Sequence, residues 1–381
     1  MQIYLDNAAT TRPCAAAVSA IADSIENFGN PSSLHCMGIA SERLVEAARE
    51  EIARAIGAKS SEIFFTSGGT EANNLAILGG AKAHNGNRIV TTGAEHPSVA
   101  ETIKELGRRG FEMFHVEHFG GPVSQDSLKT ALEQPVALVS IHHVNNETGV
   151  VQDVASLGKI IKQAEPKTLF HVDGVQSFCK LPIDVAAMNI DLLSLSAHKV
   201  GGIKGCGALY VRGGVHLRPM IFGGGHEGNL RSGTQNVPGI AAFAAAVKHQ
   251  MQNMRDKFSH VSALNEKFLA EIDRVGGVQV NGENLMPYIL NISVEGVRPE
   301  VLLNALSAKG VCISAGAACS SNRRQKAEDS AVLRSYGLSA DRVGTAVRIS
   351  FCSDNTDEEI TDAAGIFMDC VKDLRRLPKL R

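Results

Sequence analysis

The stretch "DLLSLSAHKVGGIKGCGALYVR" (191–212) joins two short apolar runs through a turn rich in glycine. The runs 191–198 and 206–212 both have the composition of buried β-strands. Because the connection is too short for a helical crossover, we expect the two strands to pair antiparallel. The turn carries Lys199 and Lys204, and neither lysine has an acidic residue within five positions. Such a lysine either lies in solvent or has an amine that does covalent chemistry.

Upstream of this stretch, from about residue 60, short β-rich runs alternate with helical patterns. The runs are "EIFFT" (62–66), "RIVTTG" (88–93), "FEMFHV" (111–116), "VALVSIHH" (136–143) and "TLFHVDG" (168–174). With the two runs of 191–212 they make seven strand candidates. Helices between consecutive strands predict an α/β fold with a mostly parallel sheet that is covered on both faces.

A different pattern follows the long helical stretch that begins near residue 237. Runs such as "YILNISVEG" (288–296) and "AVRISFC" (346–352) predict a smaller α/β unit. The first residues, "IYLDNA", are too few to form a unit alone, and we expect them to pack with this one. We therefore predict a large domain over residues 15–250 and a small domain made of residues 1–14 with 251–381.

The composition excludes several classes of protein. The chain has 381 residues, 44% of them hydrophobic and 20% charged, with a net charge of −2, as in an ordinary globular protein that does not bind nucleic acid. No run of about 18 apolar residues predicts a membrane span. The eight cysteines form no C-x-x-C pair, which argues against a zinc knuckle and suits a reducing compartment. We expect a cytoplasmic protein.

Polar residues follow several of the predicted strands, where open α/β sheets bind their ligands. Gly69 and Thr70 form a turn into a helix that suits an anion, Asp173 ends one apolar strand, and His96 and Asn146 follow two others. Each also has a simpler explanation, as a turn, a helix cap or an ordinary loop residue. Taken together with a lysine, they are the parts that a pyridoxal phosphate site requires.

Motifs along the whole chain resemble those of one enzyme family. They are "YLDNAATT", "FGNPSSLH", "FTSGGTEANNLAI", "EHPSV", "HVNNETGVVQ", "HVDGVQ", "SAHK", "GALYVR", "GGGHEGNLRSGTQNVPGI" and "SAGAACSS". In this order they resemble the cysteine desulfurases of the nitrogen-fixation and iron–sulfur-assembly type, which are class V aminotransferase relatives. The resemblance runs from residue 3 to about 370. It implies the fold of type I pyridoxal phosphate enzymes, with a seven-stranded, mostly parallel sheet in a large domain and a smaller α/β domain.

The same resemblance implies roles for the residues that would hold the cofactor ring. Lys199 matches the lysine that forms a Schiff base with pyridoxal phosphate, whereas Lys204 matches a later lysine of the turn. Asp173 would pair with the pyridinium nitrogen. The ring hydroxyl would be bonded by Gln176 and Asn146.

Further residues match the contacts to the ring face and the phosphate. His96 would stack on the ring and carry protons, which makes it a catalytic residue beside Lys199. The phosphate would be held by Gly69, Thr70, Ser196 and His198. In "RSGT", Thr234 resembles a residue that reaches the phosphate from a partner subunit, which implies a homodimer with shared sites.

The substrate and the sulfur have their own candidates. Arg348 resembles the clamp for the substrate carboxylate, and Asn30 is similar to a residue of the substrate pocket. Cys319 matches the catalytic cysteine. It follows "AGAA" and precedes a polar run, a composition typical of a mobile loop, whereas many cysteines are small core residues.

The resemblance implies an enzyme that converts L-cysteine to L-alanine. The sulfur would be captured as a persulfide on Cys319 and passed to an acceptor protein, such as an iron–sulfur scaffold, for cluster or thio-cofactor synthesis. No metal site is expected, apart from Cys319 as a transient iron–sulfur ligand. Three alternatives stay open: a selenocysteine or cystine lyase, an aminotransferase of the same fold group, and a catalytically silent binding subunit. A lyase or aminotransferase would not need the Cys319 thiol.

Overall fold

A seven-stranded sheet forms the centre of the larger part of the chain. The computed structural model describes residues 2–82, 86–315 and 330–376. The strands of the sheet are β2 (Ile63–Thr66), β3 (Arg88–Thr92), β4 (Glu112–Val116), β5 (Val136–His142), β6 (Leu169–Asp173), β7 (Leu192–Ser196) and β8 (Gly207–Val211). All seven lie within the predicted runs, so the predicted α/β fold class is confirmed.

The strands have the order β2-β8-β7-β6-β5-β3-β4. The five strands from β7 to β4 pair parallel. β8 pairs antiparallel with β7, as the short connection predicts, and also with β2. The first strand of the sheet in the sequence therefore lies at its edge, beside the last one.

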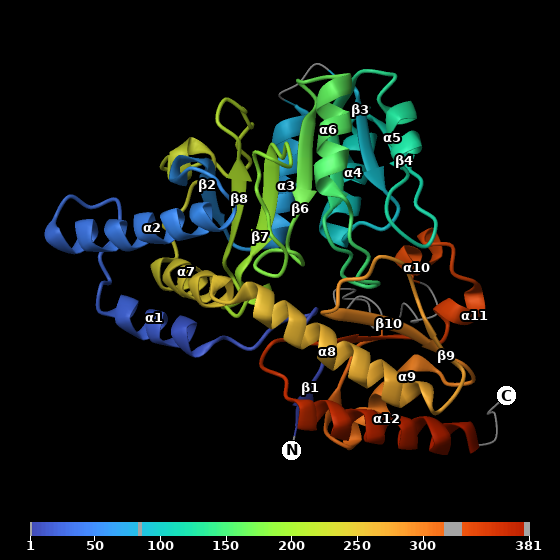
Figure 1. Cartoon of the computed structure of the whole chain (residues 1–381). Coiled ribbons are helices and arrows are strands. Elements are labelled where there is room, and N and C mark those ends of the chain that lie inside the picture. Colours follow the sequence, from blue (N-terminus) through green and yellow to red (C-terminus); the bar gives the residue numbers. More distant parts are fainter. Residues whose placement is uncertain (1, 83–85, 316–329, 377–381) are drawn as a thin grey trace.

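Helices cover both faces of this sheet (Figure 1). α3 and α4 pack on one face, and α2, α5, α6 and α7 share a second apolar cluster with the other. The helices of this part are α1 (Ala15–Ile25), α2 (Cys36–Ala55), α3 (Gly69–Ala81), α4 (Pro97–Arg108), α5 (Gln125–Ala131), α6 (Val154–Ala164) and α7 (Val237–Met251), with 3₁₀ turns η1 (Ser60–Glu62), η2 (Ala197–Lys199) and η3 (Glu227–Asn229).

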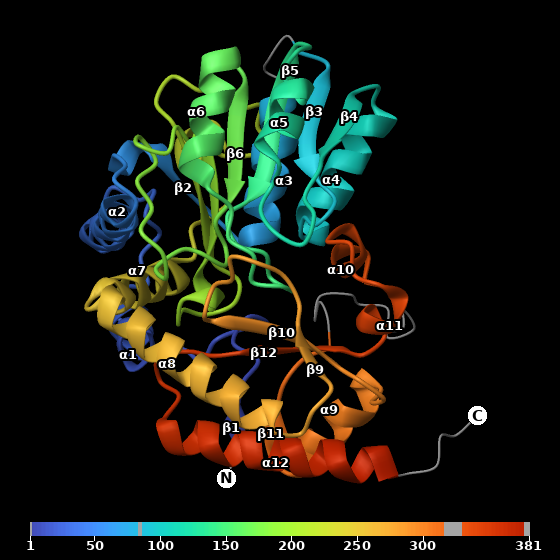
Figure 2. The ribbon, with the colours of Figure 1, turned by 45° about the vertical axis from the view of Figure 1, so that its right-hand side comes forward.

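A smaller unit lies beyond the carboxyl ends of the parallel strands, which run toward it in Figures 1 and 2. Its antiparallel sheet has the order β12-β10-β9. The short strand β1 (Ile3–Tyr4) pairs parallel with β11, so the N-terminus lies in this unit. The elements are α8 (Met254–Asp273), β9 (Val278–Val280), β10 (Ile289–Val294), α9 (Pro299–Ala308), β11 (Val311–Cys312), α10 (Ala331–Ser335), α11 (Ala340–Val343), β12 (Ala346–Ser350) and α12 (Asp357–Arg376).

The apolar residues form separate cores in the two parts. One large cluster takes its buried members from residues 45–247, and another takes them from residues 3–8, 144 and 261–371. The division into domains stays a prediction, and these cores support it. No helix in the described ranges is long and apolar enough to cross a membrane.

A close backbone contact holds β8 against the turn that follows β2. A Cβ atom at Gly207 would lie 2.6 Å from Gly68 Cα and 2.6 Å from Leu195 O. Both neighbours are backbone atoms, which cannot move aside as a flexible side chain can. The turn that leads into α3 thus requires glycine at position 207.

We predict that Gly207→Ala lowers the free energy of unfolding by about 1–3 kcal/mol, because the added methyl group overpacks this contact. Urea denaturation followed by circular dichroism measures the change. The matched control is Gly365→Ala in α12, where an added Cβ meets nothing within 4 Å. Alanine is a better helix former than glycine, so this control raises the free energy of unfolding by up to about 1 kcal/mol. Equal effects of the two substitutions would contradict the prediction.

Candidate functional site

A cavity of about 120 Å³ lies at the carboxyl ends of the parallel strands. Its wall brings together ten of the predicted site residues, nine from the large part and one from the small part. They are Gly69, Thr70, His96, Asn146, Asp173, Gln176, Ser196, His198, Lys199 and, from β12, Arg348. Residues from segments that are far apart in the sequence thus share one hollow.

Lys199 stands in the cavity because η2 continues directly from β7. Its side chain is buried, and Nζ donates hydrogen bonds to the carbonyl oxygens of Ala8 at 2.5 Å and Ala9 at 2.8 Å. Lys204 is exposed on the turn and lines a different groove. The two lysines of the turn therefore have different environments.

Asp173 ends β6 with its carboxylate buried at the edge of the sheet. Oδ1 accepts a hydrogen bond from the backbone nitrogen of Val175 at 3.0 Å, and Oδ2 accepts one from Asn73 Nδ2 at 2.9 Å. One donor on each oxygen fixes the orientation of the carboxylate.

His96 is the N-cap of α4, and its ring is half-buried. Nδ1 accepts from the backbone nitrogen of Ser98 at 3.1 Å, which places the ring proton on Nε2 and makes Ser98 Oγ, at 2.7 Å, a second donor. Asn73 Nδ2 donates to the same Ser98 Oγ at 2.8 Å. Asn73 therefore connects the carboxylate of Asp173 to the imidazole of His96.

Sequence reasoning missed Asn73, although it lies in the quoted motif "FTSGGTEANNLAI". A usable signal was its spacing, because residues four positions apart lie on the same face of a helix and Asn73 follows Gly69 by four. Gly69 opens α3, and a Cβ there would lie 2.9 Å from Val175 Cγ2.

The other end of the cavity suits an anion. The first residues of α3, Gly69 and Thr70, present a helix N-terminus, which favours negative charge. His198 lies beside it, with Nδ1 at 3.1 Å from Thr10 Oγ1. Burial and the charge of Lys199 lower the pKa of His198 to about 4, so its imidazole is neutral at neutral pH.

Four residues of the cavity wall hold a buried polar atom that has no hydrogen-bond partner in the described part of the chain. They are Asn73 Oδ1, Gln176 Oε1, Ser196 Oγ and Arg348 Nε. Buried polar atoms are normally bonded, so these four indicate a polar ligand. A ring hydroxyl suits the acceptor on Gln176, and a phosphate suits the hydroxyl of Ser196. The residues therefore fit pyridoxal phosphate.

Two predicted site residues do not line this cavity in the structure. Thr234 and Asn30 are exposed and are absent from its described lining, and Asn30 Oδ1 instead accepts from the backbone nitrogen of Ser32 at 2.9 Å. Cys319 lies outside the described residues. The roles of these three residues stay predictions.

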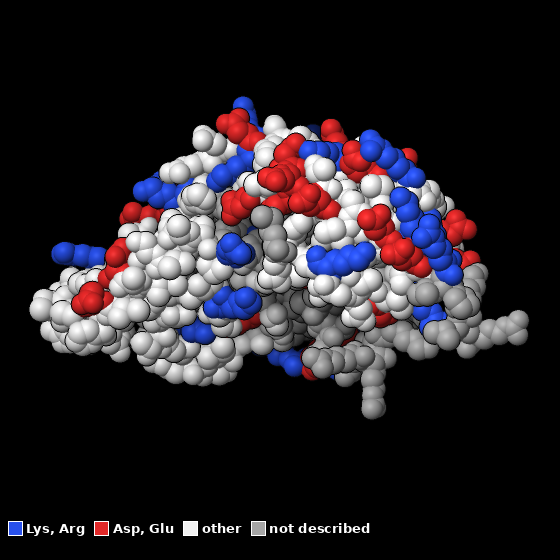
Figure 3. Space-filling model, turned by 90° about the horizontal axis from the view of Figure 1, so that it is seen from below, with Lys and Arg blue, Asp and Glu red and all other residues white. Residues whose placement is uncertain are grey.

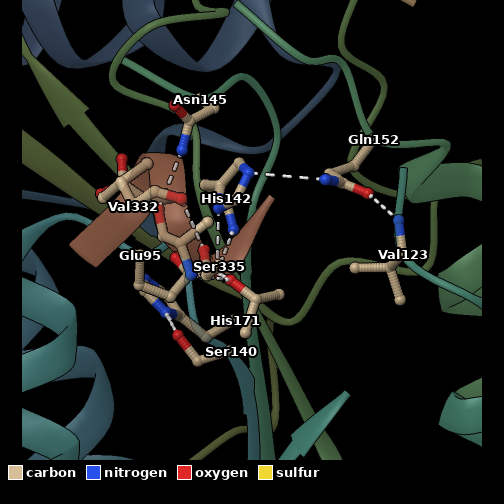
Figure 4. A network of polar contacts seen from close by, with 12 residues as sticks. Glu95, Val123, Ser140, His142, Asn145, Gln152, His171, Val332 and Ser335 are labelled. Atoms are coloured by element: carbon tan, nitrogen blue, oxygen red, sulfur yellow. Dashed lines mark hydrogen bonds and ion pairs between the residues drawn. The ribbon is translucent and has the colours of Figure 1, made fainter. Parts of the chain in front are cut away.

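Sequence reasoning also missed a buried pair that supports the loop before His96 (Figure 4). Glu95 Oε1 accepts from Thr92 Oγ1 at 2.7 Å and from His142, through Nδ1 at 2.9 Å and the backbone nitrogen at 3.2 Å. Thr92 ends β3 and His142 ends β5. The pair therefore ties the loop that presents His96 to the strand beside Asp173.

The hydrogen-bond roles of the two ring nitrogens of His142 follow from its second neighbour, Gln152. Gln152 Oε1 accepts from the backbone nitrogen of Val123 at 2.8 Å, so its amide nitrogen faces His142 Nε2 at 3.4 Å (Figure 4). A nitrogen that faces a donor is an acceptor. Nε2 of His142 therefore accepts from Gln152, and Nδ1 donates to Glu95. The sequence showed two histidines at this strand end, without indicating which polar groups they meet.

Comparisons with known sequences agree over nearly the whole chain. The family model described as "Aminotransferase class-V" matches residues 3–362. The protein named "Putative cysteine desulfurase IscS 1" of Bacillus subtilis (strain 168) is 41% identical over 382 residues, which cover 98% of this chain and 99% of that protein. The "Cysteine desulfurase IscS" of Dictyoglomus turgidum (strain DSM 6724 / Z-1310) is 38% identical, with 99% and 96% covered.

Solved structures agree with the sequence matches. A structure titled "NIFS-LIKE PROTEIN" superposes with a TM-score of 0.92 at 34% identity, covering 98% of this chain and 100% of that one. Another, titled "SspA in complex with cysteine", has a TM-score of 0.81 at 34% identity, with 93% and 100% covered.

We predict that Lys199→Ala removes the visible absorption band of pyridoxal phosphate bound to the protein, because no other amine on the cavity wall replaces it among the described residues. Lys204→Ala is the matched control and keeps the band, since Lys204 is exposed on the same turn. The absorbance of dialysed protein measures both. A normal band in Lys199→Ala, or its loss in Lys204→Ala, would contradict the assignment.

Proposed function

The chain belongs to the class V aminotransferase family, it is a pyridoxal phosphate-dependent cysteine desulfurase, and we propose that its Cys319 receives the sulfur of L-cysteine. The net reaction converts L-cysteine and the Cys319 thiol into L-alanine and a Cys319 persulfide. One observation carries the proposal: Lys199, Asp173 and Arg348 line a single cavity, and four buried polar atoms of its wall have no hydrogen-bond partner among the described residues.

Each residue of the cavity has a task in this reaction. Bound pyridoxal phosphate supplies an electron sink that stabilises negative charge at the substrate Cα. Asp173, oriented by Asn73, holds a proton on the pyridine nitrogen. Lys199 takes the proton from Cα, because its amine reaches the cavity from the end of η2. Arg348 binds the substrate carboxylate through its guanidinium group.

The sulfur step belongs to Cys319 and His96. The Cys319 thiolate attacks the sulfur of the substrate, a new S–S bond forms, and the bond between sulfur and Cβ breaks with its electron pair left on carbon. His96 carries the proton that completes L-alanine, and its Nε2–H is the group available for this.

The persulfide then passes to an acceptor protein, such as an iron–sulfur scaffold, and we propose that this occurs in the cytoplasm. The seven described cysteines are all free thiols, as suits that compartment.

We also propose that two copies of the chain form a homodimer that shares its sites. Phe28, Leu34 and Phe222 are 83%, 94% and 81% exposed, which is typical of an interface. Charged side chains gather over the helices of the small unit in Figure 3, whereas the side where α1 lies is largely uncharged. The loop of Thr234 is held against α2 by a buried ion pair of Arg49 with Glu227, at 2.8 Å. Thr234 is thereby presented, exposed, for a partner subunit.

The sulfur assignment predicts that Cys319→Ser keeps the absorption of bound pyridoxal phosphate but loses nearly all formation of alanine from L-cysteine. The reason is that a hydroxyl cannot hold the transferred sulfur. Alanine and sulfide are measured together, in the presence of a thiol reductant. Cys36→Ser, at an exposed cysteine of α2, is the control and keeps full turnover. Unchanged turnover in Cys319→Ser would exclude the persulfide step and favour a lyase or an aminotransferase.

The homodimer predicts a sedimentation mass of twice 40.4 kDa. Leu34→Glu should shift this mass toward the monomer, because a charge placed at the apolar interface must be desolvated. Leu34→Met is the matched control and should leave the mass unchanged. A wild-type protein that sediments as a monomer would refute the shared site.

A further inference from the structure

A short segment near the N-terminus forms hydrogen bonds with four of the predicted site residues of the cavity: Gln176, His198, Lys199 and Arg348. We call residues 6–11 the N-terminal segment. Ala8 O accepts from Lys199 Nζ and also from Gln176 Nε2 at 2.9 Å. Thr10 Oγ1 meets His198 Nδ1, and Asp6 bonds Arg348. The amine of Lys199 and the guanidinium of Arg348, which is proposed to bind the substrate carboxylate, are thus both held by one short segment of the chain.

Arg348 is held in the cavity wall by two hydrogen bonds. Its side chain is 1% exposed, Nη1 donates to Asn146 O at 2.8 Å, and Nη2 donates to Asp6 Oδ1 at 2.8 Å. Two contacts on different nitrogens fix the plane of a guanidinium group. Nε, which is buried, has no partner in the described ranges. A carboxylate that enters the cavity can therefore bind along the edge that includes Nε.

Asp6 is itself fixed by its backbone. It forms an isolated bridge with Ser350, and its carbonyl oxygen accepts from Ala9 N at 3.0 Å and from Tyr4 Oη at 3.1 Å. Asp6 is not among the described residues that line the cavity. Its carboxylate consequently acts on the cavity through Arg348.

We propose that Asp6 is a positioning residue for substrate recognition, which holds the Arg348 guanidinium in the plane that receives the α-carboxylate of L-cysteine. This inference rests on the proposed role of Arg348. The carboxylate of an amino acid is attached to the Cα from which Lys199 takes the proton, so Lys199 and Arg348 must keep a fixed spacing. Asp6 and Ala8 are two residues apart, at most about 7 Å along the chain, and they set that spacing.

Two substitutions separate orientation from charge. Asp6→Ala removes the acceptor, so Arg348 loses one of its two contacts and binds carboxylates less well. Asp6→Asn keeps an oxygen that can accept from Nη2, so the guanidinium plane is retained. If Asp6 instead competed with the substrate for Arg348, both variants would bind carboxylates more tightly than the wild type.

The test compares two ligands that differ by the carboxylate. Wild-type holoenzyme and its variants are titrated with L-alanine and with ethylamine, and the change in the absorption of the bound cofactor gives the dissociation constants. We expect Asp6→Ala to reduce the preference for L-alanine over ethylamine about tenfold. Asp6→Asn should keep most of it, and so should Asp126→Ala, a control at an exposed carboxylate. The KM for L-cysteine should rise in Asp6→Ala far more than kcat falls.

An unchanged or greater preference for L-alanine in Asp6→Ala would overturn the proposal. So would an equal loss in Asp6→Ala and Asp6→Asn with unchanged melting temperatures, because charge rather than orientation would then be decisive. Arg348→Ala tests the proposed role of Arg348 separately from that of Asp6. If that variant keeps the wild-type preference, the proposed role of Arg348 fails before that of Asp6 is tested.

Discussion

Polar groups that are buried at one edge of the sheet each need a hydrogen-bond partner, and this requirement determines how the segments around the cavity are arranged. The parallel strands end at a common edge of the sheet, where the side chains of Asp173 and Lys199 are both buried. Backbone groups and amides supply much of what these residues need: Asn73 bonds Asp173, and the carbonyl oxygens of Ala8 and Ala9 bond Lys199. The atoms that remain unbonded in the described wall are then the ones that select the ligand.

The partners of these groups come from all over the chain. Asn73 comes from α3, which follows the first strand of the large sheet, Ala8 comes from the N-terminal segment, and Arg348 comes from β12, the last strand. A second layer supports the first, since Glu95 fixes the loop of His96 through His142 without contact to the unbonded atoms. Such shared support makes the orientation of each reactive group depend on several distant segments.

The sequence predicted the strands well because each is a short apolar run with a glycine-rich or polar end. It also predicted the antiparallel β7–β8 pair, since the length of a connection limits the topology. The partners of the buried polar groups were not predictable, because local pattern reports whether a residue is buried but not what it meets. Asp6 with Arg348 and Glu95 with His142 are such pairs. Asn30 and Thr234 lie outside the cavity lining of a single chain, and a motif cannot tell whether its residues serve their own chain or another.

The pairing of the two chain ends has a consequence for synthesis. Leu5 bonds Cys312 and Ser350 through the backbone, and Asn7 bonds Ser350. These partners are translated more than 300 residues after Leu5 and Asn7, whose backbone groups cannot pair with them until they leave the ribosome. The large sheet can form earlier, from residues 63–211. The cavity is therefore completed late in the synthesis of each chain. A truncated chain that ends before β12 would lack Arg348 even where the large sheet has folded.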